Sequence, residues 1–127
     1  MATIPDFNDA ERWVVESALR ERYGERVPIE LADAEVRLDP DVPALASCPA
    51  IYWSARGAHF VIVKVGEDRY RCQFFYSAMQ QYGTARAEYD ELAGCVVSLL
   101  RAQADHEKET RGVHSGMARD ELGEDGE

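Results

Sequence analysis

Hydrophobic residues near the N-terminus recur at the spacing of an α-helix. They are Val14, Val15, Ala18, Leu19 and Tyr23. Asn8 followed three positions later by Glu11 matches a capping box, in which each side chain accepts a hydrogen bond from the other residue's backbone. Gly24 is suited to end the helix, and Pro28 prevents it from resuming. The pattern therefore predicts a helix over about residues 9–23.

A strand-like alternation begins in the segment "PIELADAEVRLDP". Its apolar residues change parity: Ile29 and Leu31 occupy odd positions, whereas Val36 and Leu38 occupy even ones. Because side chains alternate strictly along a strand, we expect a bulge or a break near Ala32–Ala34. The proline-rich segment that follows, "DPDVPALASCP", is typical of a loop.

Three further strands are predicted in "AIYWSA", "AHFVIVKV" and "RYRCQFFYS". Arg56-Gly57 separates the first two, and Gly66-Glu67-Asp68 separates the last two. Both separators favour tight turns, so we expect the strands to pair as antiparallel hairpins.

The apolar pattern favours one alignment of the second hairpin. This alignment forms the pairs Val65–Tyr70, Val63–Cys72, Val61–Phe74 and His59–Tyr76. A shift by one residue would set the valines opposite Arg69, Arg71 and Gln73 and would bury charge. A two-residue turn in the first hairpin adds Tyr52 to the same apolar face.

This alignment sends a second group of large side chains to the other face of the sheet. The group consists of Ile51, Trp53, Phe60, Ile62 and Phe75, with Lys64, Arg71 and Gln73 toward the turn end. Isolated monomers rarely expose several hundred Å² of contiguous apolar surface, and a single aromatic side chain accounts for about 150–250 Å². We therefore expect either a helix of the chain or a partner to cover this face.

A second helix is predicted after Thr84, which can cap its N-terminus. Its apolar stripe consists of Tyr89, Leu92, Ala93, Val96, Leu99 and Leu100. Gly94 indicates a close contact between this helix and the sheet, and we expect the helix to end at about residues 106–110. The preceding segment "AMQQYG" is predicted to be a loop or a single helical turn.

The order of elements predicts an α+β fold with an N-terminal helix, a four-stranded antiparallel sheet and a long C-terminal helix. A chain of 127 residues suits one domain, which we place over residues 1–108. Residues 109–127 are rich in glycine and acidic residues and are predicted to be a disordered acidic tail.

Charge and composition narrow the classes of function. The chain carries 14 Lys and Arg against 24 Asp and Glu, a formal net charge of −10, and it has no basic run. Nucleic-acid binding is therefore disfavoured, because phosphate backbones attract basic surfaces. No apolar run approaches the roughly 20 residues that span a membrane, and the N-terminus lacks the pattern of a secretory signal. These features predict a cytoplasmic protein without a membrane partner.

Candidate catalytic and metal-binding residues are sparse. The three cysteines (Cys48, Cys72 and Cys95) have no close spacing, so they indicate neither a zinc site nor a disulfide framework. His59 and Cys72 share the predicted apolar face, but a metal needs more ligands than these two. There is no serine-nucleophile motif and no glycine-rich phosphate loop. We therefore expect no cofactor, no metal and no enzymatic activity.

The leading hypothesis is a small acidic accessory protein of the inhibitor, immunity, assembly-factor or chaperone type. It would bind another protein, or a second copy of itself, through the aromatic face of the sheet. The predicted binding residues are Ile51, Trp53, Phe60, Ile62, Arg71 and Phe75. A competing structural explanation is that the two helices cover both faces of the sheet.

Two further hypotheses remain open at this stage. The first is a small-ligand-binding domain or minor enzyme, with a pocket between sheet and helices lined by Tyr52, His59, Tyr76 and Tyr82. The second is an acidic decoy for a nucleic-acid-binding enzyme, whose binding would weaken steeply with salt.

Overall fold

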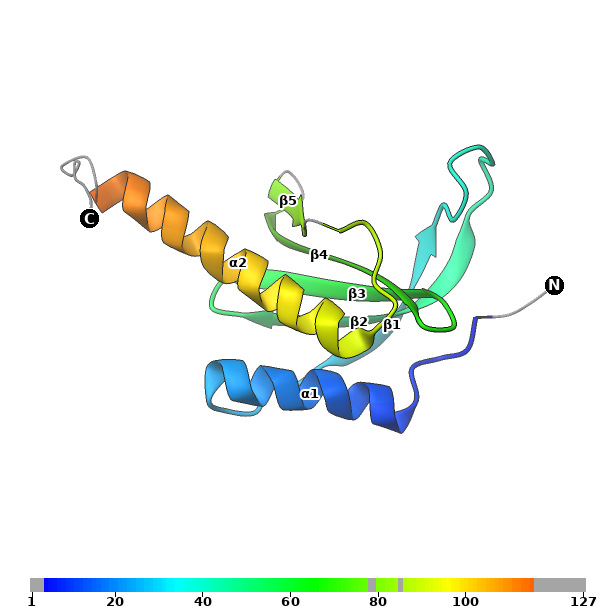
Figure 1. Cartoon of the computed structure of the whole chain (residues 1–127), viewed down its shortest axis with the longest axis horizontal. Helices are drawn as coiled ribbons and strands as arrows, with labels where there is room; N and C mark the ends of the chain where they lie inside the picture. The colour runs from blue at the N-terminus through cyan, green and yellow to red at the C-terminus, as the bar shows by residue number, and fades with distance from the viewer. Residues whose placement is uncertain (1–3, 78–79, 85, 116–127) are drawn as a thin grey trace.

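The chain folds as a helix, a five-stranded antiparallel sheet and a second helix (Figure 1). The computed structural model describes residues 4–77, 80–84 and 86–115. The elements are α1 (Asp9–Tyr23), β1 (Glu30–Val36), β2 (Ala46–Ala55), β3 (Ala58–Gly66), β4 (Arg69–Ser77), β5 (Gln80–Gly83) and α2 (Leu92–Ser115). The strands follow one another in the sheet in chain order, each antiparallel to its neighbours. The predicted α+β class is confirmed.

Helix α1 begins and ends where the sequence predicts. The Asn8 side chain accepts a hydrogen bond from the Glu11 backbone N–H at 2.8 Å, and the Glu11 carboxylate accepts one from the Asn8 N–H at 2.9 Å. Gly24 ends the helix with a φ of 75°, a left-handed conformation that glycine adopts without strain. The predicted capping box is therefore confirmed.

The sheet has five strands rather than the predicted four. Gln80–Gly83, predicted as a loop or a helical turn, forms the edge strand β5 and pairs with β4. At the other edge, β1 pairs with β2 without interruption, so the bulge predicted at Ala32–Ala34 is wrong. The parity argument assumed that Leu31 faces a core. Leu31 is instead 55% exposed, because an edge strand does not need a buried face along its whole length.

The first hairpin has the predicted register, and the second does not. Tyr52 lies opposite Val61, and Arg56-Gly57 forms the two-residue turn. Between β3 and β4 the predicted alignment is wrong by one residue. The observed pairs are Phe60↔Phe74, Ile62↔Cys72 and Lys64↔Tyr70, and the register shifts between Lys64 and Gly66.

The physical reason for the second register lies on both faces of the sheet. The observed alignment does turn a charge inward, but Lys64, only 4% exposed, is neutralised by Glu11 of α1, whose Oε1 is 2.9 Å from its Nζ. On the other face, Gln73 lies opposite Val61 and Arg71 lies opposite Val63. This is the one-residue shift that the sequence analysis rejected because it would bury charge. Arg71 and Gln73 are only half-buried there, so placing these polar groups on that side costs little.

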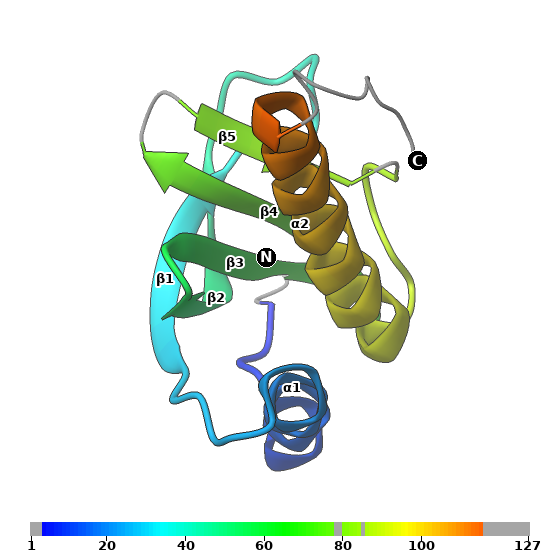
Figure 2. The ribbon, with the colours of Figure 1, turned by 90° about the vertical axis from the view of Figure 1, so that its left-hand side faces the viewer.

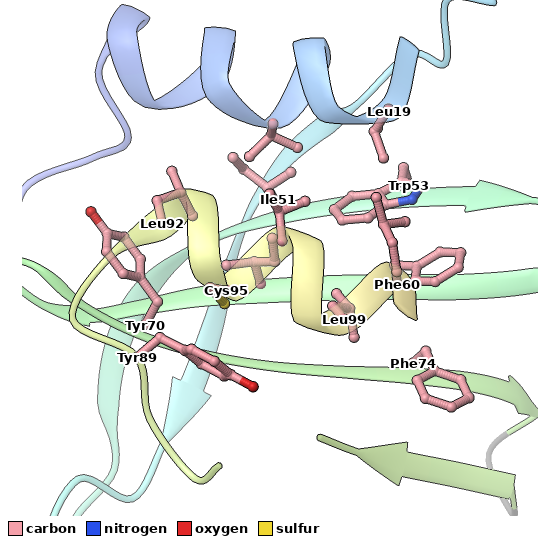
Figure 3. Packing of buried hydrophobic residues seen from close by; sticks show 14 of the residues in the cluster. Leu19, Ile51, Trp53, Phe60, Tyr70, Phe74, Tyr89, Leu92, Cys95 and Leu99 are labelled. Atoms are coloured by element: carbon pink, nitrogen blue, oxygen red, sulfur yellow. The ribbon is translucent and has the colours of Figure 1, made fainter. Parts of the chain in front are cut away.

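Both helices lie on the same side of the sheet (Figure 2). Val15 and Leu19 of α1, and Leu92, Cys95, Val96, Leu99 and Leu100 of α2, pack in one buried cluster with side chains of β2, β3 and β4. The sheet contributes Ile51, Trp53, Ala58, Phe60, Ile62, Tyr70 and Phe74 (Figure 3). The molecule is therefore a two-layer structure with a single main core between the helices and one face of the sheet.

Helix α2 begins later and ends later than predicted. Tyr89, placed in the predicted helical stripe, forms an antiparallel bridge with Tyr70 through backbone hydrogen bonds of 2.8 and 2.9 Å. The helix starts at Leu92, and Thr84 is not its cap. It continues to Ser115, so residues 109–115 of the predicted disordered tail are helical, whereas residues 116–127 lie outside the described part of the chain.

The predicted close approach of Gly94 to the sheet is also wrong. A Cβ atom placed on Gly94 would meet only the Glu91 Oε1 atom, at 4.0 Å. This glycine is therefore not required by packing.

Candidate protein-binding face

The predicted binding residues do not form one surface. Ile51, Trp53, Phe60 and Ile62 are each at most 1% exposed, because both helices cover their side of the sheet. Phe75 and Arg71 lie on the opposite side, since their neighbours across the ladder are His59 and Val63. The prediction that these side chains share an uncovered face is therefore wrong for two reasons. The register error in the second hairpin misplaced Phe75 and Arg71, and both helices cover the side that carries the other four residues.

The uncovered side of the sheet carries a different set of aromatic and β-branched residues. We call it the open face and define it by Tyr52, His59, Val61, Val63, Gln73 and Phe75, which come from β2, β3 and β4. All of these side chains are half-buried. Within residues 4–77, 80–84 and 86–115, no helix covers them (Figure 2).

Three stacked rings cross the open face from strand to strand. The Tyr52 and His59 rings are 6.0 Å apart between centroids and inclined by 17°, and the His59 and Phe75 rings are 5.2 Å apart, also at 17°. The Tyr52 hydroxyl lies 2.6 Å from His59 Nδ1. Ring stacking and this hydrogen bond hold the three side chains against one another across the strands, which gives the face a fixed, largely apolar shape.

Charged groups beside the open face are paired within the molecule. Arg71 donates hydrogen bonds to the backbone oxygens of Arg37 at 3.1 Å and Leu38 at 3.4 Å, and to Glu88 at 3.0 Å. Arg69 contacts both oxygens of Glu88. Burial alone would raise the pKa of Glu88, but the hydrogen bonds and positive charges of Arg71 and Arg69 lower it overall. The centre of the open face is therefore uncharged.

The four residues of the predicted ligand pocket lie on two different sides of the sheet. Tyr52 and His59 belong to the open face, whereas Tyr76 and Tyr82 lie on the helix-covered side with Phe74. The sheet separates the two pairs, so they do not line one pocket. The prediction placed them together because of the same register error.

Tyr76 and Tyr82 instead contact His106 of α2. The Tyr76 hydroxyl accepts a hydrogen bond from Gln103 Nε2 at 3.2 Å and lies 3.2 Å from His106 Nδ1. The Tyr82 and His106 ring centroids are 4.3 Å apart. The spacing of Leu99, Gln103 and His106 at i, i+4 and i+7 was a signal for this contact, because it places all three on one helical face.

Among the described residues, no group of three or more His, Cys, Asp or Glu side chains could hold a metal ion. In the same part of the chain, neither helix is both long enough and apolar enough to cross a membrane. Comparison of the chain with protein-family models, with curated proteins and with solved structures finds no match.

Proposed function

We propose that this chain is a non-enzymatic, cytoplasmic accessory protein that binds a partner protein through the open face. The observation that supports this proposal is the one-sided arrangement of the helices. It leaves stacked rings and valines of three central strands facing solvent in the described part of the chain. Contiguous apolar patches of this kind mark interaction surfaces in soluble proteins.

The chemistry of the open face points to the apolar side of a helix in the partner. The face offers no unpaired charge at its centre, so a charged partner surface would lose water without gaining an ion pair. Helices are the elements that cover sheet faces, as α1 and α2 do on the other side. Strand addition at the β1 edge is less favourable, because Glu30, Asp33 and Glu35 lie along it.

The experiment compares two exposed apolar side chains on different surfaces. Tagged wild-type protein, Phe75→Ser and Trp13→Ser are purified from the native host and their bound proteins identified. Trp13 is the matched control, because it is 67% exposed but lies on α1, away from the open face. We expect a specific partner to be retained by wild type and Trp13→Ser and lost from Phe75→Ser, with similar thermal unfolding midpoints for all three.

Two outcomes contradict the proposal. One is a partner that Phe75→Ser retains and Trp13→Ser loses, which would place the interface on the helices. The other is a homodimer, detected by sedimentation of the purified chain and broken by Phe75→Ser, which would make a second copy the occupant of the open face.

A further inference from the structure

His59 is the middle one of the three stacked rings on the open face. Its ring centroid lies 6.0 Å from that of Tyr52 and 5.2 Å from that of Phe75. Of the residues that define the open face, His59 is the one whose side chain ordinarily changes charge between pH 5 and 8. The centre of the open face is therefore uncharged only while His59 is neutral.

The uncovered protein accommodates both charge states of the His59 ring. In a neutral ring with an unprotonated Nδ1 atom, the Tyr52 hydroxyl donates to Nδ1 across 2.6 Å. In the imidazolium ring, Nδ1–H donates to the Tyr52 oxygen, so the hydrogen bond is kept with its direction reversed. The neighbouring Tyr52 and Phe75 rings attract a cation, and the His59 side chain is only half-buried. Protonation therefore costs little while no partner covers the face.

The strands on either side of His59 supply no counter-charge for the imidazolium ring. On β2 the adjacent side chains are Tyr52 and Ser54, and on β4 the adjacent side chain is Phe75. None of the carboxylates in the described part of the chain forms an ion pair with His59.

The charged groups on the same side of the sheet lie further away. Arg69 and Arg71 are toward the other end of β4, and both are bonded to Glu88. Glu30 of β1 lies opposite Tyr52, with β2 between it and β3. An apolar partner that covers the open face would therefore enclose the imidazolium without a counter-charge, which is unfavourable.

We propose that His59 is a proton-sensitive switch, whose neutral ring permits an apolar partner surface to bind the open face and whose imidazolium ring opposes that binding. This role rests on the proposed function of the open face. A partner that binds only the neutral form loses up to about tenfold in affinity for each pH unit over which the ring takes up its proton. Binding weakens as pH falls, because the proton must leave before the partner covers the ring.

The test uses octyl-agarose as a defined apolar surface. Its aliphatic chains offer no aromatic ring that would attract a cation. Wild type, His59→Phe and Phe75→Ser are loaded at high ammonium sulfate concentration and eluted with a falling gradient, at about pH 8 and again at about pH 5.5. At the higher pH, wild type and His59→Phe should both elute at lower salt than Phe75→Ser. At the lower pH, wild type should elute at higher salt than His59→Phe, because only wild type then carries a charge at the centre of the face.

Two further variants control for changes other than the charge of His59. His59→Gln keeps an acceptor for the Tyr52 hydroxyl without an ionisable ring, so it should behave like His59→Phe. His106 contacts Tyr76 and Tyr82 on the helix-covered side, so His106→Gln should keep the wild-type response to pH. Circular dichroism at both pH values verifies that each variant is folded.

The outcomes distinguish a failure of the switch from a failure of the proposed function. If wild type and both His59 variants respond equally to pH, the switch is wrong and the open face keeps its proposed role. If Phe75→Ser is retained as strongly as wild type at the higher pH, the open face is not the apolar binding surface, and both proposals are wrong. A response to pH that His106→Gln abolishes would assign it to the helix-covered side and would also overturn the switch.

Discussion

At the residue scale, Glu11 has two structural roles at once. Its carboxylate caps α1 at Asn8, and it also accepts hydrogen bonds from Lys64 of β3 at 2.9 Å and from the Tyr70 hydroxyl of β4 at 2.5 Å. It therefore fastens the start of α1 to the sheet. Phe7 adds to this contact, because the Lys64 Nζ lies 5.8 Å from the centre of its ring.

The ion pair gives the first prediction. Burial would raise the pKa of Glu11, but hydrogen bonds from Tyr70, Asn8 and Lys64 outweigh it and hold the pKa below its ordinary value. A lowered carboxylate pKa stabilises the fold above the ordinary value of about 4.3, and this contribution is lost as pH falls through the folded pKa. We expect Glu11→Gln to destabilise the protein by roughly 3 kcal/mol at pH 7, because it leaves Lys64 buried without a counter-charge.

Urea unfolding between pH 7 and pH 3 measures this effect. The difference between wild type and Glu11→Gln should shrink as pH falls below about 4. Asp9→Asn is the control, because it removes a neighbouring carboxylate from the same helical turn that is paired only with surface-exposed Arg12. A constant difference across the pH range would show that the loss comes from shape or capping rather than from the ion pair.

The role of a single residue could be predicted only where its contact partner is close in sequence. The cap at Asn8 could be predicted because its partner is three positions away. The inward orientation of Lys64 could not, because the group that neutralises it lies 53 positions away in another element. When that partner is not known, a local pattern argues against any alignment that buries a lysine. The sequence analysis therefore chose the other alignment, which placed Trp53 and Phe75 on one face.

At the element scale, the strongly periodic segments were predicted and the weakly periodic ones were not. β5 has a glutamine-rich sequence without alternation, and it forms because β4 offers it an open edge. The helical stripe wrongly included Tyr89, since a residue three positions before Leu92 fits both a helix and an extended segment. The bridge to Tyr70 decides between them, and that contact is not visible in a local pattern.

Helix α2 gives the second prediction. Gly94 has room for a side chain, so Gly94→Ala should stabilise the protein by about 0.5–1 kcal/mol through helix propensity. Gly24→Ala is the matched control at a positive φ of 75°, where an alanine is strained, and it should destabilise by roughly 1 kcal/mol. Chemical denaturation of both variants measures the two changes. A destabilising Gly94→Ala would indicate a close contact at α2 that the structure does not contain.

At the scale of the whole molecule, the open face and the net charge favour different partners. The chain has a formal net charge of −10, whereas the centre of the open face carries no unpaired charge. A partner with basic groups would be attracted to the acidic surface over a distance. A partner that binds the open face would be held by apolar contact. The two modes respond differently to ionic strength, because salt screens exposed charges and leaves apolar burial almost unchanged.

This difference gives the last prediction, which belongs to the proposed function. A complex captured on tagged wild-type protein is washed at increasing sodium chloride concentration, from about 0.1 to about 1 M, over which the screening length falls from about 10 to 3 Å. We expect the partner to remain bound throughout, and purified components to show a dissociation constant that changes by less than about tenfold. Release of the partner as soon as the salt concentration is raised would instead support the acidic-decoy hypothesis. The Phe75→Ser variant links the result to the surface, because an interface on the open face should be insensitive to salt and sensitive to this substitution, whereas an acidic interface should show the reverse.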